Sequence, residues 1–224
     1  MKVLILDSGP LINLSMNGLL YLIEDLKKNF NGKFIITEQV KNEVYDRPKG
    51  IKRFKLGALR IKSLLDKKII EPPSSLNITN KSIEEKTTEM MDLVNHSYKS
   101  RGQWINLVSK AEMSCLALNQ ELIKQKIDSI IAIDERTTRV ICEKPENLEK
   151  LMTRRLHKQV RLKNPEIKKL KDHKIIRSSE LVYVAYKKGI VKLKDPKVLE
   201  ALIYATKFKG SSISFEEIDV LKKL

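Results

Sequence analysis

Short runs of apolar residues alternate along the chain with apolar stripes at helical spacing. The first run, residues 3–6, contains no polar position, which is typical of a strand buried on both faces of a parallel sheet. Three further runs predict strands at residues 33–37, 67–70 and 129–133. Because strands and helices alternate at the spacing of βα units, the sequence predicts an α/β fold. We expect a three-layer α/β/α arrangement around a central parallel sheet.

Apolar stripes and capping residues locate the helices between these strands. Ser8 and Pro10 are typical of a helix start, Thr37 and Ser109 are suited to be N-caps, and Ser82 begins a capping-box pattern with Glu85. The predicted helices lie at residues 8 onward, 19–26, 38–44, 51–67, 82–98 and 109–122. The βα rhythm resumes at 174–189, and a helix started by a proline and ended by a glycine follows at 195–210.

Residues 144–173 interrupt this rhythm. The stretch carries ten basic residues against four acids, and few of its side chains are large and apolar. We therefore predict one domain over residues 1–224, with an inserted basic helical arm at about 144–173 that is not part of the core.

The charge of the chain points to a polyanionic partner. There are 44 Lys and Arg residues against 28 acids, a formal net charge of +16. Nucleic acid fits this balance better than a membrane surface, while the alternative is a lysine-rich solvated surface without a ligand role. No apolar stretch is long enough for a membrane span or a signal peptide, so we expect a cytoplasmic protein. Cys115 and Cys142 are expected to be reduced and buried in helices.

Four carboxylates occupy equivalent places in the predicted βα units. Asp7 and Asp134 each follow a buried strand, and Glu43 and Glu112 lie in helices that follow strands. Because the carboxyl ends of parallel strands face one edge of a sheet, these acids are expected to converge there. Clustered carboxylates repel one another unless cations neutralise them, and hard oxygen ligands suit Mg²⁺ or Mn²⁺. The set predicts a metal-dependent site that hydrolyses phosphodiester bonds.

Each acid also has an explanation that involves no chemistry. Asp7 or Asp134 alone could be a helix N-cap, and Glu112 stands three residues after Ser109, as a capping box requires. Glu43 alone could be an exposed helical residue. Glu135 could be an additional ligand or a solvated residue at a helix start.

Four segments of the chain resemble the acidic motifs of PIN-domain ribonucleases, a family that includes the toxins of bacterial and archaeal toxin–antitoxin pairs. The segments read LILDSGPLINL, ITEQVKNEV, SKAEMSCLAL and IAIDERTTRV, and the resemblance extends over residues 1–50, 105–143 and 174–218. It implies a PIN-like α/β/α fold and endoribonuclease activity with Mg²⁺ or Mn²⁺. It also implies that Asp7, Glu43, Glu112 and Asp134 are both catalytic and metal-binding, and that Ser8 supports a metal-bound water.

Several features depart from the family pattern. Lys110 and Glu135 stand where acidic motifs commonly have another acid or a second Asp, and residues 144–173 have no counterpart in the compact toxins. Both a toxin role with an antitoxin partner and a role in RNA processing with a ribonucleoprotein partner therefore stay open, as does a homodimer. We expect the basic arm to bind RNA, although a solvated helix or a protein interface is the alternative. The expected RNA-binding residues are Arg154, Arg155, Lys158 and Arg161.

Other function classes lack their sequence signatures. A haloacid-dehalogenase-type phosphatase needs a second Asp two positions after Asp7, where Gly9 stands. The phosphate-binding P-loop and the glycine triad of a dinucleotide site are both absent. The alternative from a different class is a PIN-like protein that binds RNA or a ribonucleoprotein without cleaving it.

Overall fold

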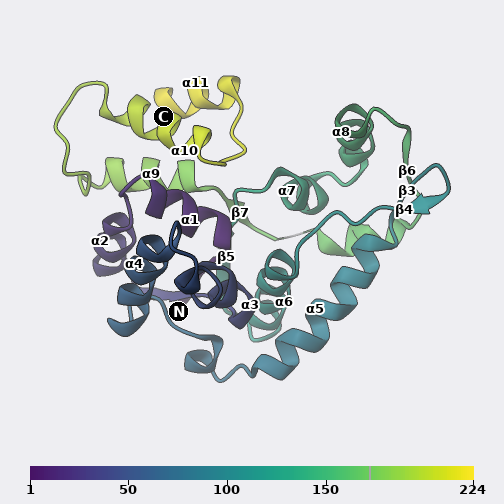
Figure 1. Ribbon diagram of the computed structural model, residues 1–224, viewed down its shortest axis with the longest axis horizontal. Coiled ribbons are helices and arrows are strands. Elements are labelled where there is room, and N and C mark those ends of the chain that lie inside the picture. Colours follow the sequence, from purple (N-terminus) through teal and green to yellow (C-terminus); the bar gives the residue numbers. More distant parts are fainter. Residues whose placement is uncertain (172) are drawn as a thin grey trace.

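The computed structural model of the protein, which describes residues 1–171 and 173–224, has a mixed α/β fold (Figure 1). The helices are α1 (Ser8–Met16), α2 (Tyr21–Lys28), α3 (Glu38–Lys41), α4 (Lys55–Asp66), α5 (Asn80–Asn95), α6 (Lys110–Lys124), α7 (Arg136–Glu143), α8 (Glu146–Leu156), α9 (Ser178–Lys187), α10 (Val198–Phe208) and α11 (Phe215–Lys223). Shorter helical segments are η1 (Asn42–Asp46), η2 (Pro48–Gly50), η3 (Pro73–Leu76) and η4 (Pro165–Leu170).

A parallel sheet forms the centre, as predicted, and it has four strands. Its strands are β2 (Gly32–Ile35), β1 (Lys2–Leu6), β5 (Asp128–Ala132) and β7 (Ile175–Ile176), in this spatial order. Gly32 begins β2 because a Cβ there would lie 2.2 Å from the carbonyl oxygen of Lys2. The sheet and its helices are compatible with a three-layer α/β/α arrangement: α6 packs on β1 and β5, while α2 packs on β2 and contacts α9.

The strand predicted at 67–70 is wrong. Lys67 is the C-cap of α4, and Lys68 adopts a left-handed backbone conformation with a φ of 56°, so the chain turns where the strand was expected. Pairing is limited to one parallel bridge between Ile35 and Glu71, and Pro72 follows at once. Proline cannot donate to a ladder, which stops the pairing.

The predicted arm at 144–173 is only partly helical. It contains α8, a strand β6 (Val160–Leu162) and η4, and Asp172 lies outside the described residues. β6 pairs antiparallel with β3 (Tyr98–Ser100), which also pairs with β4 (Gln103–Trp104), so a second, three-stranded sheet has the order β4-β3-β6. Figure 1 shows this small sheet beside α8, away from the parallel sheet.

The expectation that the arm is not part of the core is also wrong. Five of its side chains are buried in the main apolar cluster: Leu148, Met152, Val160, Ile167 and Leu170. Leu148 and Met152 are four residues apart on α8, so one helical face covers apolar surface while the basic residues stay outside. We call α8, β6 and the paired strands β3 and β4 the basic subdomain.

Two helix starts differ from the predictions. α5 begins at Asn80, because the side chain of Thr79 rather than Ser82 accepts the capping hydrogen bond, which Ser82 itself donates from its backbone. α10 begins at Val198, two residues after Pro196.

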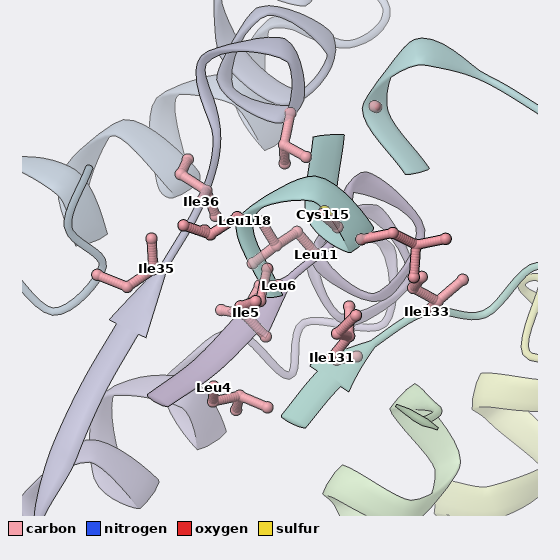
Figure 2. Close-up of a cluster of buried hydrophobic side chains, with 14 of the residues drawn as sticks. Leu4, Ile5, Leu6, Leu11, Ile35, Ile36, Cys115, Leu118, Ile131 and Ile133 are labelled. Atoms are coloured by element: carbon pink, nitrogen blue, oxygen red, sulfur yellow. The ribbon is translucent and has the colours of Figure 1, made fainter. Parts of the chain in front are cut away.

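The core beneath the candidate acids is apolar. In Figure 2, side chains of β1 pack with residues of β2, α6 and β5, and Cys115 lies among them. Cys115 and Cys142 are free and buried within helices, which confirms the prediction, and burial raises the pKa of both thiols. In the part of the chain that the structure describes, no helix is both long and apolar enough to cross a membrane.

Candidate functional site

Asp7 lies at the junction of β1 and α1 and is nearly fully buried, with 3% of its surface exposed. Its Oδ2 atom accepts a hydrogen bond of 3.4 Å from the backbone N–H of Gly9, so it is the N-cap of α1. Its Oδ1 atom is buried and has no hydrogen-bond partner. Burial, followed by the negative charges of Glu112 and Glu43, raises the pKa of Asp7 to about 7. An unpaired carboxylate oxygen in this position is costly unless something outside the chain neutralises it.

Glu112 stands in the first turn of α6, three residues after Ser109. The predicted capping box is confirmed: Ser109 Oγ accepts from the Glu112 backbone, and Glu112 Oε2 accepts from the Ser109 backbone. The same Oε2 accepts a hydrogen bond of 2.6 Å from the hydroxyl of Thr138. Burial raises the pKa of Glu112, while the hydrogen bonds from Thr138 and Ser109 act in the opposite direction. The capping role therefore coexists with a place beside Asp7.

Glu43 reaches the same place through an irregular helix. The side chain of Thr37 caps α3, and after one turn the helix widens into the π-helical segment η1, which contains Glu43. Glu43 is half-buried. Its charge contributes to the raised pKa of Asp7 and of the buried thiol of Cys115. The charges of Asp7, Glu43 and Glu112 also act on the buried thiol of Cys115 in α6 and raise its pKa.

Asp134 follows β5 at the same sheet edge. A methyl group built on Gly9 would lie 3.4 Å from Asp134 Cβ and 3.6 Å from Asp7 Oδ2, so Gly9 separates the two acids closely. Both carboxylate oxygens of Asp134 are occupied by protein donors. Oδ1 accepts from the backbone and hydroxyl of Ser178 at 2.8 and 2.9 Å, and Oδ2 accepts from Asn13 Nδ2 at 3.2 Å. Burial raises the pKa of Asp134, and these hydrogen bonds oppose the rise.

The alternative that Asp134 caps the following helix is wrong. Glu135 is the N-cap of α7, because its side chain accepts hydrogen bonds from the backbones of Thr137 and Thr138. The interpretation of Glu135 as a residue at a helix start is therefore confirmed. Asp134 instead joins the end of β5 to α1 and to the start of α9.

Ser8 is the first residue of α1 and is half-buried beside Asp7. Its backbone N–H lowers the pKa of Asp7. The support of a metal-bound water by its hydroxyl stays a prediction.

Three residues that hold the acids were missed by the sequence analysis: Asn13, Thr138 and Ser178. Asn13 is buried in an otherwise apolar stretch, and its Nδ2 also donates to the carbonyl of Thr206 at 2.8 Å. A polar residue inside an apolar helical stripe needs a partner, and that was the available signal. Ser178 and Thr138 gave no such signal, because hydroxyl residues are common in the first turn of any helix.

The four predicted RNA-binding residues are all exposed; three of them lie at two distinct positions, and Lys158 lies between α8 and β6. Arg154 of α8 and Arg161 of β6 line one hollow, together with Lys150. Arg155 Nη1 lies 3.9 Å from Oε1 of Glu135, and Glu135 is the residue next to Asp134. The basic subdomain therefore begins directly beside the acidic edge of the sheet.

The described acids do not form a complete set of metal ligands. Among the described residues, no group of three or more His, Cys, Asp and Glu side chains is arranged to hold a metal ion. One reason is that the carboxylate oxygens of Asp134 already accept hydrogen bonds from Ser178 and Asn13. The unpartnered Oδ1 of Asp7, with the charges of Glu43 and Glu112 beside it, nevertheless has the chemistry of a hard cation ligand.

Comparisons of the chain with protein-family models, with curated proteins and with solved structures give no match.

Proposed function

We propose that the protein is a Mg²⁺- or Mn²⁺-dependent endoribonuclease with a PIN-like three-layer α/β/α domain. The observation that carries the proposal is the buried, unpartnered Oδ1 of Asp7, beside the charges of Glu43 and Glu112. This arrangement destabilises the folded chain unless a cation binds, and such a cost is a mark of functional sites.

The chain's own residues have distinct parts in this proposal. Asp7, Glu112 and Glu43 would hold the metal through carboxylate oxygens. Asp134 is placed beside Asp7, fixed by Ser178 and Asn13, and Ser8 would orient a water. Bound Mg²⁺ or Mn²⁺ would supply an activated water and neutralise charge on the phosphate.

The charge distribution favours a polyanion, such as RNA, as the substrate. The candidate carboxylates repel a polyanion, and a net charge of +16 with the exposed Arg and Lys residues of the basic subdomain would attract it. Arg155, at 3.9 Å from Glu135, marks the point where the two regions meet.

The alternative is a PIN-like protein that binds RNA or a ribonucleoprotein without cleaving it. The engaged oxygens of Asp134 favour this alternative, since each of them already accepts a hydrogen bond from the protein. A small antitoxin gene beside this one would favour a toxin role, and its absence would favour RNA processing.

A cleavage assay decides between the two functions. Short labelled single-stranded RNAs are incubated with the wild-type protein in Mg²⁺, in Mn²⁺ and in EDTA, and the Asp7→Asn variant is assayed beside it. Asp219→Asn is the matched control, because Asp219 is exposed on α11. We expect metal-dependent cleavage by the wild type and by Asp219→Asn, and none by Asp7→Asn. Wild-type rates with Asp7→Asn would reject the site, and RNA binding without cleavage under any metal would support the alternative.

A further inference from the structure

The outer face of the small sheet carries a row of three side chains, one from each strand. Lys99 of β3 pairs directly with Trp104 of β4 on one side and with Arg161 of β6 on the other. Residues opposite each other in an antiparallel pair share a face. The neighbouring Tyr98 points to the other face, where it is fully buried and donates a hydrogen bond of 2.7 Å to the carbonyl of Pro145. We call Arg161, Lys99 and Trp104 the Trp104 row.

Trp104 is held in place but not covered. Its side chain is 42% exposed, and it lies on a strand of two residues after the turn at Arg101 and Gly102. Lys99 Nζ lies 4.1 Å from the centroid of the indole ring, and the His96 ring lies nearly perpendicular to the indole with 5.5 Å between the two centroids. An aromatic ring fixed in this way needs little further ordering to stack with a ligand.

The two positive charges of the row lie close together, and that of Lys99 lies over the indole ring. Lys99 and Arg161 stand directly opposite each other, which is unfavourable for two like charges. Across residues 1–171 and 173–224, neither forms an ion pair with a carboxylate, whereas Lys168 and Lys171 both pair with Glu146. Like charges that face each other on an exposed sheet are stabilised when an anion binds between or beside them.

The hollow next to the row extends the same surface. Arg161 lines it together with Lys150 and Arg154. Its one acid, Glu149, is engaged, since Oε1 accepts a hydrogen bond from the backbone of Leu162. A basic surface therefore runs from the indole ring to α8.

We infer that the Trp104 row is a binding site for single-stranded RNA, in which a base stacks on Trp104 and phosphates contact Lys99 and Arg161. That the polynucleotide is RNA rests on the proposed function. Single strands are favoured because their bases can leave the stack and lie on an aromatic ring, whereas duplex bases are already stacked on one another. The combination of a stacking ring and a positively charged groove is how proteins bind single strands without sequence preference.

The chain offers a direct optical test, because Trp104 is its only tryptophan. The wild-type protein is titrated in EDTA, which prevents metal-dependent cleavage, with a ten-nucleotide single-stranded RNA and with a duplex of the same length. We expect the single strand to quench the tryptophan fluorescence and the duplex to leave it nearly unchanged. RNA binding, followed by anisotropy of a labelled strand, without any change in tryptophan fluorescence would overturn the inference.

Variants test the stacking and the charge separately. Trp104→Ala is expected to weaken binding about tenfold or more, and Trp104→Phe to retain most of the affinity. Phe54→Ala is the matched control, since Phe54 is 48% exposed and lies 5.4 Å from the Arg53 guanidinium on a different part of the molecule. Equal losses in Phe54→Ala and Trp104→Ala would overturn the inference.

Lys99→Ala keeps the fluorescent ring and decides the matter if Trp104→Ala does not fold. It is expected to weaken binding severalfold and to reduce the salt dependence, while RNA still quenches the ring. Unchanged affinity would count against the row.

The inference and the proposed function can fail independently. Quenching by RNA without cleavage in Mg²⁺ or Mn²⁺ rejects the nuclease and supports the row. Cleavage without quenching supports the nuclease and rejects the row. Binding of anionic vesicles in place of RNA would also reject it.

Discussion

The hydroxyl of Thr138, in the first turn of α7, donates a hydrogen bond of 2.6 Å to Oε2 of Glu112, in the first turn of α6. Thr138 is fully buried, so this bond fixes the carboxylate of Glu112 relative to the end of β5. Two helix starts that are 26 residues apart in the chain are thereby tied together at the acidic edge.

Thr138→Val removes this donor with little change in volume. The bond lowers the pKa of Glu112, so its loss should raise that pKa and move the acidic limb of the cleavage profile to higher pH. Unfolding free energy should fall by about 1–3 kcal/mol. Melting curves and the pH dependence of cleavage measure both effects. The control is Thr87→Val, whose hydroxyl bonds only a carbonyl of its own helix; a shift of the profile there as well would reject the assignment.

Glu112→Gln separates capping from metal binding. Glutamine can accept the hydrogen bonds from Ser109 and Thr138, so the melting temperature should change little. A metal site needs the negative charge, so cleavage should be lost. Full activity in this variant would leave Glu112 with its capping role alone.

Asp7→Asn should stabilise the metal-free protein at alkaline pH. The pKa of Asp7 is raised from 3.8 to about 7 on folding, so the folded state holds the proton more tightly than the unfolded state. The contribution of Asp7 to the free energy of unfolding is therefore greatest below pH 4. It falls as the pH rises to about 7 and does not change further above that pH. Asparagine has no such titration and caps helices equally well.

The expected gain of Asp7→Asn is roughly 2–4 kcal/mol at pH 8 in EDTA, and little at pH 4. Thermal melts across this pH range measure it. Added Mn²⁺ should raise the melting temperature of the wild type and not that of the variant, because a ligand stabilises only the state that binds it. Equal pH curves for the two proteins would contradict the burial of an ionisable Asp7.

Asp134→Asn should destabilise the protein, in contrast to Asp7→Asn. Both oxygens of Asp134 face donors, from Ser178 on one side and Asn13 on the other, so an amide group must direct its N–H against one of them. We expect a loss of about 1–3 kcal/mol at pH 8. Denaturant unfolding of the Asp7 and Asp134 variants in one metal-free buffer compares them directly, and a stabilised Asp134→Asn would show that its hydrogen bonds are misassigned.

The basic subdomain can be tested through salt. Neutralising Arg154, Arg155, Lys158 and Arg161 should flatten the log–log dependence of RNA affinity on salt by up to about 2 to 3 units, since each single-strand contact contributes about 0.7. A control variant removes equal charge from exposed lysines elsewhere: Lys188, Lys194, Lys197 and Lys209. The control should change the slope much less. The same slope in the first variant as in the wild type would favour a protein interface instead.

Two central strands of the parallel sheet were predictable because the local sequence is enough to indicate them. Residues 3–6 and 129–133 are continuous apolar runs, and the acid that ends each run fixes the end of the strand. Ser109 and Glu112 likewise define a helix start by themselves. The predicted strand at 67–70 failed because apolar content does not show that Lys68 turns the chain.

The parts that could not be predicted depend on residues distant in the chain. β6 is a strand because it pairs with β3, some sixty residues earlier, and the short polar–apolar alternation at residues 159–163 does not show where its partner lies. The environment of Asp134 is similar. Its partners are residues 13 and 178. The sequence therefore predicts that the carboxylate lies at the sheet edge, but it does not predict the direction in which the oxygens point.

Because β1 lies between β2 and β5, the nascent chain exposes one edge of β1 until β5 has been synthesised. β2 emerges soon after β1, but β5 is completed only at residue 132. At ordinary rates of translation this interval is about 5–20 s. Throughout it one edge of an apolar strand has no partner, and open strand edges are where nascent chains aggregate. A ribosome stalled between residues 36 and 127 therefore carries an aggregation-prone intermediate. We expect the nascent chain to need chaperones most during this part of its synthesis.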